Sequence, residues 1–278
     1  MERKEAAMAT STDPSPGSYA ITGGVQGKQR LNLLAEIMQP TTLRLLRQAG
    51  LRSGDRCLDL GCGGGDVVLD IARISGPDGF VTGVDFDPQV VALARQDARD
   101  AGAGNVEYHV ADVRVFEGGP FDLIYARFLL SHLSEPATML TRMRQLAYPG
   151  GRIVVEDTDM SGCYCHPRDP ANTRFAELYT EVVRRGGGDA DLGRRLPALA
   201  LAAGLGDVHW NVFQPVHVSG PHKHMTALTM ERIRAAVLRH GPATDQEIDT
   251  IIDGMHAFAQ DPATLVGMPR IVQVQGTA

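Results

Sequence analysis

A glycine-rich segment in the first quarter of the chain constrains the fold most strongly. The apolar residues Cys57, Leu58 and Leu60 predict a buried strand. Four glycines follow within residues 61–65, and a helical apolar pattern starts at Val67. A strand, a glycine turn and a helix N-terminus together bring backbone close to a ligand, because glycine has no Cβ to hold the ligand away.

The residues around this turn distinguish between dinucleotides and S-adenosylmethionine, two classes of ligand that use such a geometry. A dinucleotide fingerprint has the form G-x-G-x-x-G/A, whereas this chain has Gly61, Gly63 and then Asp66 at the last position. A carboxylate at that position would repel a pyrophosphate, and Asp59 adds a second negative group. Both suit a ligand that carries a sulfonium and an ammonium. Asp85 ends the next predicted strand, where its carboxylate can accept hydrogen bonds from both ribose hydroxyls of a nucleoside.

Three segments in order resemble the first three cofactor motifs of class I S-adenosylmethionine-dependent methyltransferases of the bacterial small-molecule type. They are residues 58–65, 84–87 and 110–113, and the likeness extends over roughly residues 50 to 160. The resemblance implies S-adenosyl-L-methionine as cofactor and S-adenosyl-L-homocysteine as product. The residues expected to bind the cofactor are Tyr19, Arg30, Asp59, Gly61, Cys62, Gly63, Asp85, Phe86, Ala111, Asp112, Val113, Ala126 and Arg127.

Some of these residues have alternative roles. The resemblance implies that Asp112 accepts from the adenine amino group while the Val113 N–H reaches a ring nitrogen; Asp112 could instead cap its loop. Tyr19 either packs on a neighbouring helix or, in an N-terminal lid, lies over cofactor or substrate. Arg30 either is solvated at the start of a helix or reaches the cofactor carboxylate.

The chain alternates strand and helix patterns from residue 56 to residue 156, which predicts a parallel sheet with right-handed crossovers. The resemblance implies a Rossmann-like α/β fold: a seven-stranded sheet in the order 3-2-1-4-5-7-6, with helices on both faces. The last two strands, at 208–216 and 270–274, are expected to form an antiparallel pair. Pro40 is expected to divide the helical region 28–49 into two helices.

Five segments describe the expected domain organisation. They are a disordered leader (1–17), an N-terminal helical lid (18–50), the cofactor-binding core (51–156), a cap insert (157–190), and the C-terminal part of the core (191–278) with a helical insert at about 217–268. The two inserts are expected to build a capped pocket, which suits a small molecule and excludes a polymer.

Composition limits the partners and the compartment. The net charge of −6 argues against a nucleic-acid substrate, since phosphate binding needs clustered Lys and Arg. No apolar run approaches the ~20 residues that a membrane span requires, and residues 1–17 lack the apolar core of a secretory signal. With only four cysteines, a reducing, cytoplasmic location is expected. The expected partner is a small-molecule substrate, and a homodimer is left open.

Methyl transfer from a sulfonium is an in-line displacement, so a protein mainly supplies alignment and dehydration. His132, which follows the predicted fourth strand (121–126), is the candidate general base; the alternative is that it only orients its loop. Glu156, Asp157 and Asp159 either stabilise a cationic substrate or a divalent ion, or form a solvated turn. No metal site is expected from the histidines and cysteines, because the ligand pairs of a zinc site are incomplete.

The expected function is methyl transfer to a small-molecule acceptor, typical of enzymes that modify bacterial secondary metabolites. Two alternatives stay open: a quinone- or lipid-directed methyltransferase, and a catalytically silent S-adenosylmethionine-binding regulatory protein. The sequence leaves the acceptor and its O, N, C or S atom undetermined. Residues 127–133 lack the Asn/Asp-Pro-Pro-aromatic motif of enzymes that methylate exocyclic amines, which disfavours that substrate class.

Overall fold

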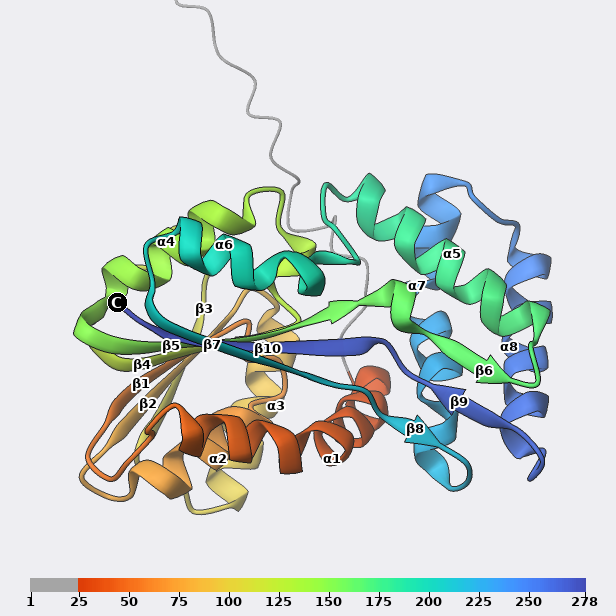
Figure 1. The fold of residues 1–278 in the computed structure, drawn as a ribbon. Coiled ribbons are helices and arrows are strands. Elements are labelled where there is room, and N and C mark those ends of the chain that lie inside the picture. The colour runs from red at the N-terminus through yellow and green to blue at the C-terminus, as the bar shows by residue number, and fades with distance from the viewer. Residues whose placement is uncertain (1–24) are drawn as a thin grey trace, which may run out of the picture.

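The computed structural model describes residues 25–278, and its centre is a seven-stranded sheet in the order β3-β2-β1-β4-β5-β10-β7 (Figure 1). The strands are β1 (Arg56–Leu60), β2 (Phe80–Asp85), β3 (Val106–Val110), β4 (Phe121–Arg127), β5 (Ala147–Asp159), β7 (Gly206–Phe213) and β10 (Arg270–Thr277). With β7 as the sixth strand of this sheet and β10 as the seventh, the order is 3-2-1-4-5-7-6. The predicted Rossmann-like fold class is therefore confirmed.

The register of the central strands places their carboxyl ends at one edge of the sheet. β1 is parallel to both of its neighbours, and Leu60 at its end pairs with Val84 of β2 and Ala126 of β4. β10 is antiparallel to both β5 and β7. Polar residues that follow β1, β2 and β4 therefore meet at the same edge, which is where open α/β sheets bind ligands.

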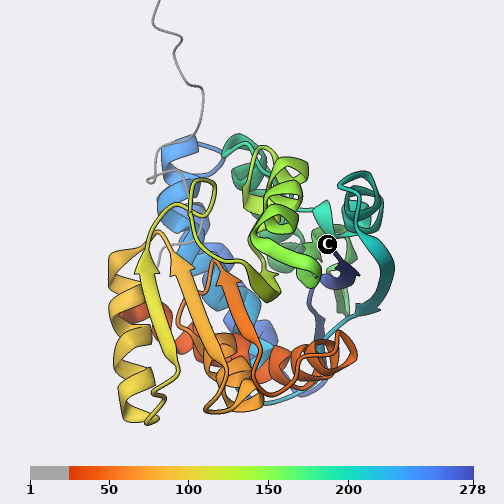
Figure 2. The same cartoon turned by 90° about the vertical axis from the view of Figure 1, so that its left-hand side faces the viewer.

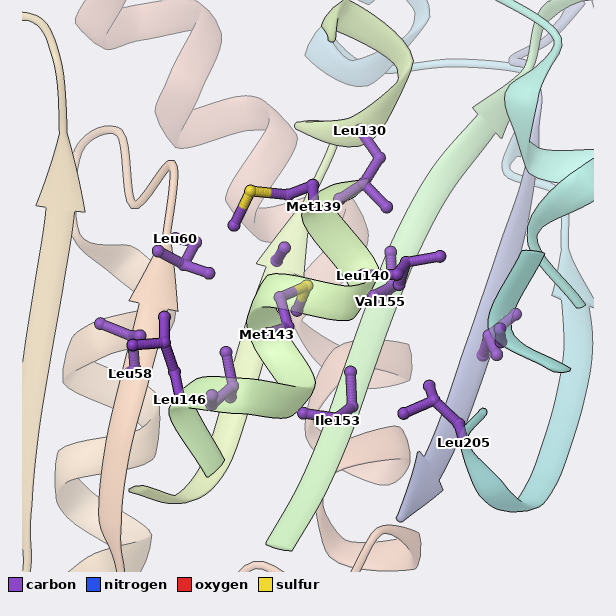
Figure 3. Packing of buried hydrophobic residues seen from close by; sticks show 14 of the residues in the cluster. Leu58, Leu60, Leu130, Met139, Leu140, Met143, Leu146, Ile153, Val155 and Leu205 are labelled. Atoms are coloured by element: carbon purple, nitrogen blue, oxygen red, sulfur yellow. The ribbon is translucent and has the colours of Figure 1, made fainter. Parts of the chain in front are cut away.

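Helices cover both faces of the sheet (Figures 1 and 2). Those on one face are α1 (Val25–Gln48), α2 (Asp66–Ser75) and α3 (Pro88–Asp100), and those on the other are α4 (Pro136–Leu146) and α6 (Leu196–Ala202). Figure 3 shows how α4 is fixed: Met139, Leu140 and Met143 point from one side of the helix toward the strands, where they pack with Leu60 and Ile153. These side chains are almost fully buried, and burial of each contributes about 1.5–3 kcal/mol.

The expected break at Pro40 is wrong, because α1 runs without interruption past this residue. Pro40 lies on the exposed side of the helix, while Met38 and Leu46 on the other side have no exposed surface. An interior proline costs a helix roughly 3 kcal/mol. Burial of the apolar residues before and after Pro40 offsets that cost, so tertiary packing keeps the helix continuous.

Segments inserted between β5 and β7 and between β7 and β10 form a cap at the carboxyl ends of the strands, on the right of Figure 1. Its helices are α5 (Pro170–Arg185), α7 (Met225–His240) and α8 (Asp245–Gln260), which share one apolar cluster. A small sheet that the sequence does not predict, β6 (Tyr164–His166), β9 (Leu265–Gly267) and β8 (Val216–His217), completes it. The predicted strand 208–216 is divided, because the chain leaves the main sheet after Phe213. No helix within residues 25–278 combines the length and apolar character needed to cross a bilayer.

Candidate active site

The glycine turn between β1 and α2 lies at the carboxyl edge of the sheet. Gly61 and Gly63 both have left-handed backbones, with φ of +71° and +51°. A Cβ on Gly61 would lie 3.1 Å from Leu129 Cδ1, a close contact that adds to the cost of a side chain on its left-handed backbone. At Gly63 no described atom lies within 4 Å of that position, and the residue lines a cavity. Gly63 therefore leaves open space beside the cavity that a side chain would fill.

The Asp85 carboxylate connects the end of β2 to this turn. Its Oδ2 accepts from the Gly63 N–H at 3.0 Å, and its Oδ1 accepts from the Asp87 N–H at 3.0 Å. A carboxylate has about four acceptor positions, so these two bonds leave acceptor capacity toward the cavity that Asp85 lines. Burial raises the pKa of Asp85, and the backbone hydrogen bonds oppose that shift.

Asp59, Asp66 and Arg127 form a charged group where β1 and β4 end. Asp59 is buried, and burial raises its pKa well above the ordinary value, while the charge of Arg127 opposes the rise. Arg127 Nη2 lies 2.7 Å from Asp66 Oδ2. Arg127 Nη1 is also buried and has no hydrogen-bond partner among the described residues. A buried guanidinium N–H without a partner is costly, so Arg127, which lines the cavity, has donor capacity that the described residues do not use.

The residues after β2 and β3 form the outer part of the same edge. Phe86 is partly exposed and lines the cavity, as do Asp112 and Val113. Asp112 is paired with Arg114 at 2.7 Å, and the hydrogen bond from Arg114 lowers the pKa of Asp112. The carboxylate can therefore act both as a loop-stabilising group and as an acceptor at the cavity wall.

A single cavity of about 270 Å³ brings most of the predicted residues together. Those that line it are Arg30, Asp59, Gly61, Cys62, Gly63, Asp85, Phe86, Asp112, Val113, Arg127 and His132. Ala111 and Ala126 do not line it: the Ala111 N–H donates to the Asp85 carbonyl, and Ala126 is fully buried in the sheet. Tyr19, the leader and the first residues of the predicted lid lie outside the described residues.

The far end of the cavity is built by residues that the sequence does not predict. They come from α1, from the loop after β4 and from the cap: Leu31, Leu34, Phe128, Leu129, Leu133, Ser134, Val182, Val183, Gly186 and Arg232. No short motif marks them, since they meet only through packing of the cap on the core. Phe128 alone has a local peculiarity, a positive φ of 53° in a non-glycine residue, which directs the chain from β4 into the cavity wall.

His132 ends a short 3-10 helix, η2 (Leu130–His132), and lines the cavity. Asp157 holds this turn, because its Oδ2 accepts from the Ser131 N–H at 2.9 Å. Burial lowers the pKa of His132 to about 4, and the nearby charge of Arg30 adds to the shift. His132 is therefore neutral at neutral pH and a weaker base than an unperturbed histidine. Burial raises the pKa of Asp157 to about 6.

The three carboxylates at the end of β5 are buried, so the alternative of a solvated turn is wrong. Glu156 accepts hydrogen bonds from Thr42, Tyr125 and Gln273, which tie α1, β4 and β10 to β5. Asp159 is paired with Arg194 and Arg270 of neighbouring elements. Within residues 25–278 no group of three or more His, Cys, Asp or Glu side chains is arranged to hold a metal ion. These carboxylates connect elements of the fold.

The fold and the turn define a nucleoside-binding core of the Rossmann-like class. Residues 51–182 match a family model described as "Methyltransferase domain". Together with the motifs at 58–65, 84–87 and 110–113, this match supports a class I S-adenosylmethionine-dependent methyltransferase domain within residues 51–182.

Two curated methyltransferases are similar in sequence to about half of this chain. The chain is 29% identical over 142 residues to a demethylmenaquinone methyltransferase of Lactococcus lactis subsp. lactis, covering 50% of this chain and 54% of the relative. It is 36% identical over 143 residues to the O-methyltransferase cnsE of Penicillium expansum, covering 49% and 50%. The chain thus spans about half the length of these curated relatives.

Among solved structures, the YcgJ protein of Bacillus subtilis has a TM-score of 0.56 at 19% identity, covering 85% of this chain and 97% of that one. The [4+2]-cyclase SpnF has a TM-score of 0.50 at 19% identity, covering 84% and 78%. Likeness at this level concerns the fold.

The cofactor of this class of domain is S-adenosylmethionine, and the chemistry of the cavity fits that molecule. The buried Asp59 carboxylate suits an ammonium, and the unpartnered Nη1 of Arg127 suits a carboxylate. Asp85 offers acceptors suited to a ribose diol. The open space beside Gly63 allows close approach of a nucleoside to the backbone.

Proposed function

We propose that this protein transfers a methyl group from S-adenosylmethionine to a small-molecule acceptor held beneath the cap. One observation carries the proposal: a single cavity is lined by Asp59, Gly63 and Asp85 at the strand ends and by Val182 and Arg232 of the cap. A donor on the strand ends and an acceptor beneath the cap would share this cavity. Nearness of the two molecules is what a displacement reaction needs most.

In this proposal the strand ends hold the cofactor by charge and shape. Asp59 binds the ammonium and Arg127 the carboxylate of its amino-acid part, while Asp85 accepts from the ribose hydroxyls. Phe86 lies against the adenine, and Asp112 accepts from its amino group. The cofactor supplies a methyl group that its sulfonium already activates.

The chain's own residues supply dehydration and alignment at the acceptor end. Leu31, Phe128 and Leu133 give an apolar wall that excludes water, which strengthens electrostatic interactions inside the cavity. His132 is neutral at neutral pH, so its ring can accept a proton from an acceptor hydroxyl or amine. Asp157 fixes the position of His132 through the Ser131 N–H.

Calorimetry with S-adenosylhomocysteine tests the cofactor half of the proposal. We expect the wild-type protein to bind, and Asp85→Asn to weaken binding roughly tenfold to a hundredfold, because hydrogen bonds to a charged acceptor are lost. Asp78→Asn is the matched control, since Asp78 is exposed at the other end of the sheet, before β2. No heat with the wild type, or equal affinities for the two variants, would contradict the proposal.

Acceptor-dependent formation of S-adenosylhomocysteine tests the transfer itself. A panel should include phenols, hydroxyaryl acids, amines and short-chain demethylated quinols. The quinols test a second candidate function, which the demethylmenaquinone methyltransferases among the relatives favour. Tight cofactor binding without turnover of any acceptor would support the silent alternative. The fold alone does not decide this point, because SpnF shares it and is described as a [4+2]-cyclase.

A further inference from the structure

A row of polar side chains crosses one face of the main sheet beside the cavity. Asp59 of β1 pairs in register with Tyr125 of β4. Glu156 of β5 pairs with Arg127 of β4 on one side and with Gln273 of β10 on the other. Tyr125 and Arg127 are two residues apart on one strand, so the whole row points to the same face. Apart from Arg127, these residues are at most 2% exposed, so their polar groups need partners.

Glu156 fixes the direction of the Tyr125 hydroxyl proton. Its Oε1 accepts from the Tyr125 hydroxyl and, at 2.7 Å, from Thr42 Oγ1, while its Oε2 accepts from Gln273 Nε2. Burial and the charge of Glu156 raise the pKa of Tyr125 well above its ordinary value, so the hydroxyl keeps its proton. Because that proton points to Glu156, the hydroxyl oxygen offers only lone pairs to any other neighbour.

Tyr125 also lines the cavity, together with Asp59 and Arg127. Arg127 does not take up the lone pairs of Tyr125 through its terminal nitrogens, since Nη2 pairs with Asp66 and Nη1 has no partner among the described residues. Asp59 is a second acceptor on the neighbouring strand. Two adjacent acceptors in a buried part of the cavity suit a positively charged group with several N–H donors.

We propose that Tyr125 is a further cofactor-binding residue, whose hydroxyl oxygen accepts a hydrogen bond from the ammonium of S-adenosylmethionine beside Asp59. The inference rests on the proposed function, because it specifies how the same cavity holds the amino-acid part of the cofactor. An ammonium has three N–H donors, so one carboxylate leaves donors for a second acceptor. A carboxylate cannot replace the ammonium here, because Glu156 holds the proton that Tyr125 would have to donate.

A purely structural role of Tyr125 would have a different signature. Tyr125 and Thr42 donate to the same oxygen of Glu156, and both are fully buried. Thr42 does not line the cavity. Thr42→Val is therefore a matched control for Tyr125→Phe: each variant removes one hydroxyl donor from Glu156, but only Tyr125→Phe removes an acceptor from the cavity. Both variants should lose stability, whereas only Tyr125→Phe should lose affinity for the cofactor.

The probes are S-adenosylhomocysteine and its deamino analogue S-(3-carboxypropyl)-5′-thioadenosine, titrated by calorimetry into the full chain. The analogue differs from S-adenosylhomocysteine only in lacking the amino group. We expect Tyr125→Phe to bind S-adenosylhomocysteine about tenfold more weakly than the wild type does, because a hydrogen bond to a charged group is lost. Its affinity for the analogue should stay within about twofold of the wild type. Thr42→Val should bind both ligands within about twofold of the wild type.

An affinity of Tyr125→Phe for S-adenosylhomocysteine within about twofold of the wild type overturns the inference and leaves the proposed function intact. An equal loss for both ligands also overturns it, since the effect would then not depend on the ammonium. Equal affinities of the wild type for the two ligands would overturn it even if a variant does not fold, which circular dichroism melts would show. If the wild type binds neither ligand, the proposed function fails first.

Discussion

Replacement of Gly63 by alanine separates the backbone cost of the glycine turn from its role beside the cavity. Gly63 has φ of +51°, and the position of an added Cβ is open toward the cavity. Gly54 is a matched control, because its φ is +86° and its Cβ position is also open. Gly54 lies in the loop before β1, away from the cavity lining.

The two variants should lose similar stability. An alanine in the left-handed region costs roughly 1–2 kcal/mol, and in a chain of this size each kcal/mol lowers the unfolding midpoint by about 2–4 °C. Only Gly63→Ala places a methyl group where the nucleoside would approach. An extra carbon in a closely packed site costs about 1–3 kcal/mol, so its affinity for S-adenosylhomocysteine should fall roughly tenfold to a hundredfold.

Thermal melts and calorimetry on both variants check this expectation. The Gly63 N–H also donates to Asp85, so a small displacement of the turn would add to the loss of affinity. Equal affinities in Gly63→Ala and Gly54→Ala, at similar melting temperatures, would refute the assignment of the open space beside Gly63 to the cofactor. A large loss of stability in Gly63→Ala alone would indicate that the turn is required for folding.

Three further predictions follow from the packing and the charges. Leu140→Ala should cost about 2–5 kcal/mol in urea unfolding because Leu140 is buried, whereas Leu201→Ala, at an exposed position, should change the free energy little. Burial raises the pKa of Asp157 in the folded protein to about 6, so ionisation of this group opposes folding. The free energy of unfolding of the wild type, relative to that of Asp157→Asn, should therefore decrease by about 3 kcal/mol as the pH rises from about 4 to above 6. If the difference between the two proteins does not change over this range, the raised pKa is contradicted. Arg127→Met should lower stability by about 1–3 kcal/mol, because it leaves the partly exposed Asp66 unpaired, and should also lower the affinity for S-adenosylhomocysteine. The double variant with Asp66→Asn should regain stability in melts but not affinity in calorimetry.

The strand order and the cofactor end of the cavity were predictable because their sequence patterns are local. Asp59 and Asp85 lie at the ends of short strands and Asp112 follows one, and parallel strands bring their carboxyl ends to one edge. Four glycines after β1 mark the turn between Asp59 and α2 without reference to the rest of the chain. Each of these features needs only a few consecutive residues, so sequence patterns suffice.

The acceptor end could not be predicted, because its parts meet only through tertiary packing. Arg30 is bonded to Thr229 across 199 positions of sequence. The sequence around Glu156 is compatible with a polar turn, but Thr42 and Gln273, which are distant in sequence, donate hydrogen bonds to its buried carboxylate. The continuous helix through Pro40 has the same origin, since distant partners bury its apolar side. Local propensity predicts the wrong structure wherever contacts with such distant residues determine the conformation.

Burial is the main cause of the lowered pKa of His132, and the nearby charge of Arg30 adds to it. Arg30 disfavours a proton on His132, and the same charge stabilises an oxyanion held nearby. A base whose pKa is about 4 takes a proton effectively only from an acceptor whose acidity is raised to match it. In the proposed enzyme, the neutral ring of His132 therefore accepts a proton only from an acceptor hydroxyl or amine whose pKa the site has lowered.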